Sequence, residues 1–262
     1  MGAPHVWRRV KERHASRCPG SLRRLYAGRE LVDDVLVTSA TTDRSPIQPL
    51  RTAAIGGLAF TVLYLLHRLL QGTGPDSSSA AAVADYNLAH RSALVASEVA
   101  VGLALLAFIP FLAALVPLIW RAGQETLAVA VAISGGVFVA MGFVSNAAET
   151  ALIAVADSDQ PAAVLALDQL QGRIPVVWAI TALVAVLSLA IQRTGLVWRW
   201  LGSVGLVAAA IFLLGSVFSV LGRTPEGSSS LLGVGLFIVW MLVLSAGLWR
   251  AAATSTSPVR SR

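Results

Sequence analysis

Six apolar runs, each close to the length that a helix needs to cross a bilayer, dominate this chain of 262 residues. A helix needs roughly 20 apolar residues to span the hydrocarbon, where every backbone polar group must find its partner inside the protein. The runs therefore predict an all-α, polytopic membrane bundle of six transmembrane helices. We place the spans at Thr52 to Leu70, Ser92 to Trp120, Thr126 to Ala156, Ile174 to Ile191, Leu201 to Leu221 and Leu231 to Trp249.

The composition agrees, with 56% hydrophobic and 13% charged residues, values far from those of soluble domains. In such a chain the meaning of the formal charge of +6 depends on where the basic residues lie relative to the spans, and the charge does not indicate a nucleic-acid partner. Cys18 is the single cysteine, which excludes an intrachain disulfide and a multi-cysteine metal site. We expect no cofactor and no metal. Arginine in place of lysine, with much Ala, Gly and Val, indicates a GC-rich bacterial gene.

The positions of the basic residues predict the orientation, because cytoplasmic loops of membrane proteins are enriched in Arg and Lys. One side carries the N-terminal tail together with Arg121, Arg193, Arg199, Arg250, Arg260 and Arg262. The opposite side carries Arg68, Arg91, Arg173 and Arg223. Both termini are therefore predicted to be cytoplasmic, in a bacterial cell (plasma) membrane. Tryptophans near the same ends are expected to be interfacial anchors: Trp120, Trp198, Trp200, Trp240 and Trp249.

Polar segments divide the chain into a basic tail over residues 1–50, a membrane domain over 51–250 and a short cytoplasmic tail over 251–262. The first tail is expected to be disordered, unless translation begins near Val35 or Val37, as valine codons allow. Between the third and fourth spans, the second outer segment "DSDQPAAVLALDQLQGR" predicts an amphipathic helix from Pro161 to Gln171 on the outer surface, with Val164, Leu167 and Leu170 on one face. The segment "QGTGPDSSSA" reads as a flexible loop, and "NLAH", Asn87 to His90, as the solvated start of the second span.

The stretch "QRTGLVWRWLGSVGLVAAAIFLLG", Gln192 to Gly215, resembles the loop and fifth helix of a bacterial family of six-helix integral membrane proteins catalogued only as a domain of unknown function. The matching positions are Gly195, Leu196, Val197, Arg199, Trp200, Leu201, Gly202, Gly205 and Leu206. "RTAAIGGLAFTVLYLL", Arg51 to Leu66, resembles the first span of that family. The resemblance covers about residues 50 to 250, and it implies six helices without an established activity or functional residues.

Two glutamates occur at one predicted height. Glu98 precedes Trp120 by 22 residues, and Glu149 follows Leu127 by 22. At 1.5 Å per residue, each lies about 33 Å above the cytoplasmic end of its helix, near the outer edge of a hydrocarbon core of roughly 30 Å. Because the second and third spans form a tight hairpin, the two carboxylates are expected to lie at the same level.

Asn146, one turn below Glu149, and His67 on the first span lie in the outer half of the membrane. One hypothesis is that His67, Glu98, Asn146 and Glu149 line an outward-facing pocket roofed by the Pro161–Gln171 helix, since ionisable residues in spans are functional candidates. Two close carboxylates there could share a proton, hold a cation, or work as acid and base. The alternative is that they are boundary residues paired with Arg68, Arg91 and Arg173 or reaching headgroup water.

No catalytic motif is recognisable. Ser145 has no His and Asp at a spacing that predicts a hydrolase triad, and His5, His14 and His90 have no metal-binding spacing. Asp157, Asp159 and Asp168 read as a solvated outer face. Three functions remain open. The first is a non-catalytic bundle that binds a lipophilic small molecule or a membrane partner protein, and the second is a membrane enzyme that acts on an isoprenoid or lipid with Glu98 and Glu149 as the acid/base pair. The third is a small transporter, which the absence of internal repeats disfavours.

Overall fold

The computed structural model describes residues 47–75, 79–158, 160–221 and 228–254. Residues 1–46 of the basic tail, with Cys18, Val35 and Val37, lie outside these ranges, as do Asp159, Arg223 and residues 255–262 with Arg260 and Arg262. Residues 47–50 and 251–254, which were predicted to belong to the two tails, lie in helices. Throughout the described ranges the regular elements are all helices.

Among the residues that the structure describes, six helices are long and apolar enough to cross a membrane, which makes the chain a multi-pass membrane protein. Each predicted span is confirmed, with ends shifted by a few residues. They are α3 (Ile47–Gln71), α5 (Arg91–Arg121), α6 (Glu125–Val155), α8 (Val176–Thr194), α9 (Arg199–Val220) and α10 (Ser228–Thr254). Two shorter helices, α4 (Ala80–Ala89) and α7 (Pro161–Arg173), lie in the connections.

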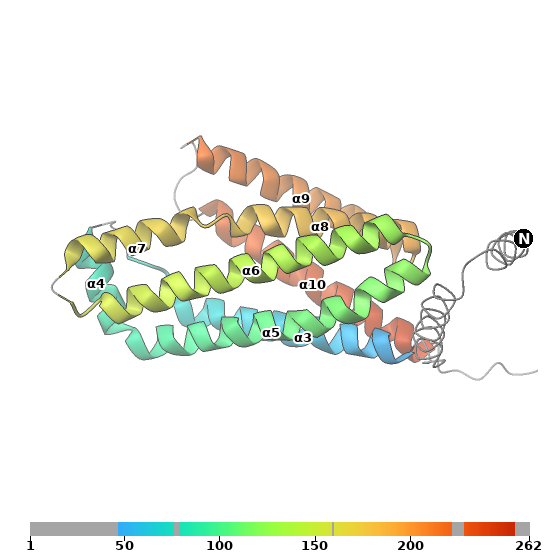
Figure 1. Cartoon of the computed structure of the whole chain (residues 1–262), viewed down its shortest axis with the longest axis horizontal. Helices are drawn as coiled ribbons and strands as arrows, with labels where there is room; N and C mark the ends of the chain where they lie inside the picture. The colour runs from blue at the N-terminus through green and yellow to red at the C-terminus, as the bar shows by residue number, and fades with distance from the viewer. Residues whose placement is uncertain (1–46, 76–78, 159, 222–227, 255–262) are drawn as a thin grey trace, which may run out of the picture. The chain divides into compact units, whose positions relative to one another are not determined.

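The six long helices pack in chain order, each against the next, and α10 returns to pack against α3. The start of α3 and the end of α10 lie at one end of this bundle, and α4 and α7 lie at the other, which we call the loop end (Figure 1). The assignment of either end to the cytoplasm stays a prediction.

Aromatic rings fill the space between the helices. Phe60 of α3 lies 4.8 Å from Phe108 of α5 and 5.9 Å from Phe237 of α10, measured between ring centroids. Phe138 of α6 lies 5.2 Å from Phe108 and 6.3 Å from Phe237. Such ring pairs stabilise a core by about 0.5–1.5 kcal/mol beyond the area that they bury. The middle of the described bundle is therefore packed with side chains.

Glycines allow the closest helix contacts, as small residues do in membrane bundles. A Cβ added at Gly56 of α3 would lie 2.9 Å from the backbone nitrogen of Phe111 on α5. One added at Gly205 of α9 would lie 2.0 Å from Ser188 Oγ on α8 and 2.7 Å from Trp240 Nε1 on α10. Trp240 is only 2% exposed and donates to the Leu201 carbonyl at 3.0 Å. Its prediction as an interfacial anchor is therefore wrong, because it closes a contact between α9 and α10.

The loop end contains more structure than the sequence predicted. Ser79 Oγ caps α4 by accepting from the Ala82 backbone N–H at 3.2 Å, within a segment expected to be a flexible loop. Asn87 is 7% exposed and donates to the Val83 carbonyl at 2.8 Å, so the expectation of a solvated start to the second span is wrong at this residue. His90, which separates α4 from α5, is exposed as expected.

The predicted outer helix is present as α7 and begins with Pro161 in its first turn. Its Val164 is 1% exposed and packs with Val83 of α4 and Leu152 of α6. Leu167 packs against the same three residues, but Leu170 is 53% exposed. The amphipathic face therefore binds α7 to neighbouring helices, and its last predicted member does not take part.

Candidate functional site

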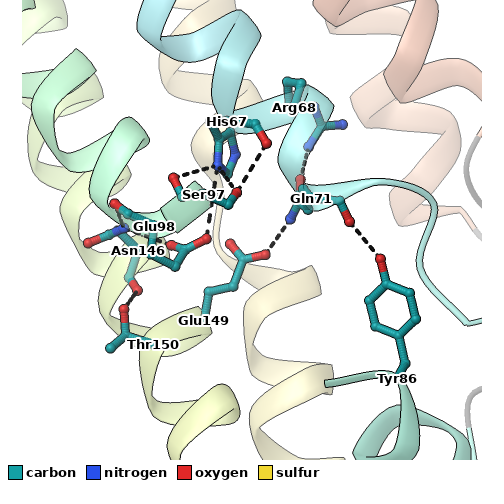
Figure 2. Close-up of polar contacts among 9 residues, drawn as sticks. All are labelled: His67, Arg68, Gln71, Tyr86, Ser97, Glu98, Asn146, Glu149 and Thr150. Carbon is teal, nitrogen blue, oxygen red and sulfur yellow. Dashed lines mark hydrogen bonds and ion pairs between the residues drawn. The ribbon is translucent and has the colours of Figure 1, made fainter. Parts of the chain in front are cut away.

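Polar side chains from three helices meet near the loop end of the bundle (Figure 2). We call this set the polar cluster. It consists of His67 and Gln71 on α3, Ser97 and Glu98 on α5, and Asn146 and Glu149 on α6. The structure thus brings the four sequence-predicted residues, His67, Glu98, Asn146 and Glu149, into one region.

Glu98 is the most enclosed carboxylate of the cluster, with 6% of its surface exposed. Asn146 Nδ2 donates to Glu98 Oε2 at 2.7 Å and to the Glu98 backbone carbonyl at 3.0 Å. The second carboxylate oxygen, Oε1, is buried without a hydrogen-bond partner among the described residues. An ionised carboxylate has about four acceptor positions. Glu98 therefore has acceptor capacity that its described protein neighbours do not use.

His67 is 5% exposed and is held by Ser97. Its Nδ1 lies 2.8 Å from Ser97 Oγ and 3.2 Å from the Ser97 carbonyl oxygen, and Ser97 Oγ donates to the His67 carbonyl at 3.1 Å. A hydroxyl has one proton to donate. Because that proton goes to the His67 carbonyl and the Ser97 carbonyl can only accept, these contacts fit the tautomer that carries its proton on Nδ1. These bonds join α3 to α5 and leave His67 Nδ1 at 3.9 Å from Glu98 Oε1.

Glu149 takes part through Gln71. Gln71 Nε2 donates to Glu149 Oε1, Arg68 Nη1 donates to Gln71 Oε1 at 2.6 Å, and Tyr86 Oη donates to the Gln71 carbonyl at 2.6 Å. Partial burial raises the pKa of the Tyr86 hydroxyl, which keeps it protonated as a donor. Gln71 thereby ties α3 to α4 and α6 (Figure 2).

Two of the arginines that were expected to pair with the glutamates, Arg68 and Arg91, contact other residues instead. Arg68 reaches Glu149 only through Gln71. Arg91 forms an ion pair with Asp157 at 3.1 Å, with both side chains about half exposed. The side chain of Arg173 lies outside the described residues. Among the side chains that the structure describes, neither glutamate is within ion-pair distance of an arginine, so the direct pairing predicted by the boundary-residue hypothesis is absent there.

A cleft of about 510 Å³ opens between α5 and α6. Its polar wall consists of Arg91, Glu98, Asn146 and Thr150, and its apolar wall of Val95, Val99, Gly102, Leu103, Leu106, Phe143, Ile153 and Ala154. Val99 and Leu106 are 58% and 54% exposed without lipid, so this wall belongs to the outer surface of the bundle. We call this feature the α5–α6 cleft, and in a membrane it faces the lipid.

The predicted pocket differs from this cleft in three respects. Among the residues described, Glu98 and Asn146 line the cleft, but His67 and Glu149 do not. No α7 residue lines it either, because α7 packs on α4 and α6. The roof expected from the Pro161–Gln171 helix is therefore absent from the described cleft. The two glutamates nevertheless belong to the same polar cluster, one on α5 and the other on α6 (Figure 2).

Sequence reasoning missed Ser97, Gln71, Thr150 and Tyr86. A usable signal was present on α3, where Tyr64, His67, Arg68 and Gln71 follow the i, i+3, i+4, i+7 spacing of one helix face. That spacing marks a polar stripe at the end of an otherwise apolar helix. Ser97 carries no comparable signal, because the hydroxyl of a lone serine in a membrane helix can donate its hydrogen bond to a backbone carbonyl of the same helix.

Within the described ranges, no three His, Cys, Asp or Glu side chains are placed to hold a metal ion. No family model, no curated protein and no solved structure matches the chain. The resemblance of Gln192 to Gly215 and of Arg51 to Leu66 to a six-helix family of unknown function stays a prediction.

Proposed function

We propose that this protein is a non-catalytic membrane bundle that binds a lipophilic small molecule in the α5–α6 cleft. The observation that carries the proposal is the composition of the cleft wall: an apolar surface that ends at the buried Glu98 and at Asn146. Binding sites for small molecules combine mostly apolar walls with a few polar groups that fix orientation. The cleft has this character, and a ligand enters it from the surrounding lipid.

The geometry gives the ligand a direction. From Glu98 to Leu106, α5 advances about 12 Å at 1.5 Å per residue, along a wall formed by Val99, Leu103 and Phe143. A hydrocarbon tail fits along this wall, and a polar head fits beside Glu98 and Asn146. The other end of the cleft, at Arg91, lies about 10 Å from Glu98 by the same rise.

The alternatives fit less well. A membrane enzyme with Glu98 and Glu149 as the acid/base pair needs both carboxylates in one cavity, and Glu149 bonds to Gln71 away from the described cleft wall. A transporter needs a path through the bundle, where Phe60, Phe108 and Phe138 pack against one another. A membrane partner protein would have to bury the exposed apolar side chains of α5, which a lipid tail does equally well.

Filling the cleft tests the proposal. Gly102 lines the cleft, and an added Cβ there meets no heavy atom within 4 Å, so Gly102→Leu begins in open space and places its side chain in the cleft. We expect this substitution to lower photolabelling by a diazirine-bearing long-chain alcohol about tenfold in lipid nanodiscs, because the tail loses its apolar contacts. Intact-mass spectrometry after irradiation measures the labelled fraction.

Gly136→Leu on α6 is the matched control. Its added Cβ also meets no heavy atom within 4 Å, and Gly136 is not among the lining residues. Labelling of this variant should equal that of the wild-type protein. Equal labelling of the two leucine variants would contradict binding in the cleft.

A further inference from the structure

We infer that the head group recognised at the cleft is a cationic ammonium, so that the ligand class is a long-chain lipophilic amine. This inference rests on the proposed function and specifies its ligand. It is carried by the juxtaposition of an apolar cleft with a buried carboxylate, Glu98, whose Oε1 has no described hydrogen-bond donor.

The first argument is the unused acceptor. A buried polar group without a partner costs about 1–3 kcal/mol, and more when the group is charged. Asn146 supplies the described hydrogen bond to the Glu98 carboxylate, and it reaches Oε2 alone. An ammonium carries three donors in a compact head, which is the complement that Glu98 needs.

The second argument is the balance of charge. The groups that face Glu98 are His67 of α3 at 3.9 Å from Oε1, and Asn146 and Glu149 of α6. Glu149 adds a second negative charge, and Arg68, the cation nearest to it in the network, is engaged by Gln71. When both carboxylates are ionised and the imidazole is neutral, one guanidinium leaves one negative charge without a counter-charge. A bound ammonium cancels this charge, whereas a neutral head does not.

The third argument is access. Glu98 belongs both to the polar cluster and to the wall of the cleft. Because a half-turn of the carboxylate only exchanges two equivalent oxygens, an oxygen reaches the cleft through a change of the χ1 or χ2 rotamer, which turns the carboxylate away from His67. An anionic head would instead meet the Glu98 carboxylate, and Arg91, the basic residue of the described cleft wall, is paired with Asp157.

Three probes that share one diazirine-bearing tail test the inference: an alkylammonium, the corresponding alcohol and the corresponding alkyl sulfate. In nanodiscs of zwitterionic phosphatidylcholine, we expect the ammonium to label wild-type protein with at least about tenfold higher apparent affinity than the alcohol. One charge-assisted hydrogen bond is sufficient for a difference of this size. The sulfate should bind most weakly.

Glu98→Gln keeps the size of the side chain and removes its charge. This variant should lose the preference for the ammonium while it still binds the alcohol, and a wholly unstable variant would lose both. Glu125→Gln, which changes an exposed glutamate outside the cleft lining, is the control and should keep the preference. Equal affinities of the three probes for wild-type protein, or a preference that survives Glu98→Gln, would overturn the ammonium assignment and leave lipophile binding standing. Labelling that Gly102→Leu does not reduce would overturn the proposed function itself.

Discussion

Replacing Gly56 by alanine is expected to lower the free energy of unfolding by about 1–3 kcal/mol, the usual cost of overpacking a filled contact. The new Cβ would lie 2.9 Å from the Phe111 nitrogen, 3.0 Å from the Ala107 carbonyl oxygen and 3.2 Å from the Phe111 Cα. All three are backbone atoms of α5, so relief requires α3 and α5 to separate. That separation also loosens the bond between His67 and Ser97. Thermal unfolding in a mild detergent measures the change.

Gly136→Ala provides the comparison for this prediction. Both glycines lie inside helices, where alanine is intrinsically better than glycine by about 1 kcal/mol. At Gly136 the added Cβ meets no heavy atom within 4 Å, so only the intrinsic gain applies. Opposite signs for the two substitutions are expected. If Gly56→Ala were as stable as Gly136→Ala, the close approach of α3 to α5 would be wrong.

The second large effect is expected at Asn146. Replacing it by leucine removes the donor to Glu98 Oε2 and leaves a carboxylate that is 6% exposed without a described hydrogen bond to either oxygen. We expect a loss of about 2–3 kcal/mol in the free energy of unfolding, since a buried carboxyl group has lost its hydrogen-bond donor. Thermal unfolding of the variant beside the wild type gives the value.

A double-mutant cycle separates this cause from general disturbance of the helix. When both partners of a buried hydrogen bond become apolar, no orphaned group remains, and the change is often nearly neutral. Glu98→Leu combined with Asn146→Leu should therefore be more stable than Asn146→Leu alone, with an interaction energy on the order of 1–3 kcal/mol. Additive losses would show that Asn146 does not satisfy Glu98.

The spans could be predicted because hydropathy and length alone decide which segments cross a bilayer. The predicted second span, Ser92 to Trp120, differs from α5 (Arg91–Arg121) by one residue at each end. The height of Glu98 and Glu149 follows from the same count. The hydrogen-bond partners of the two glutamates do not follow from the count, because they depend on how each helix is rotated about its axis. The rotation of α5 turns Glu98 toward Asn146, and the rotation of α6 turns Glu149 toward Gln71.

The connections were the least predictable part. α4 consists mainly of alanine and apolar residues without a sustained polar face, and its length of 10 residues gives little periodic signal. Its stability comes from tertiary packing of Val83 against Leu152 and Val164, which no local pattern reveals. The prediction that Trp240 is an interfacial anchor failed for a related reason. Tryptophan is common at membrane interfaces, and the buried acceptor for its indole N–H, the Leu201 carbonyl, lies on another helix, where no local pattern reveals it.

The most direct test of the account is to map where a lipophile binds. A diazirine-bearing long-chain alcohol is photolysed with the wild-type protein in nanodiscs, with and without an excess of unlabelled alcohol, and the modified residues are located by tandem mass spectrometry. The account predicts that the labelling displaced by competitor falls on the residues that line the α5–α6 cleft between Val95 and Leu106 and between Phe143 and Ala154. Labelling that resists competition and spreads equally over exposed apolar residues elsewhere, such as Val207 and Ile211 of α9, would contradict it.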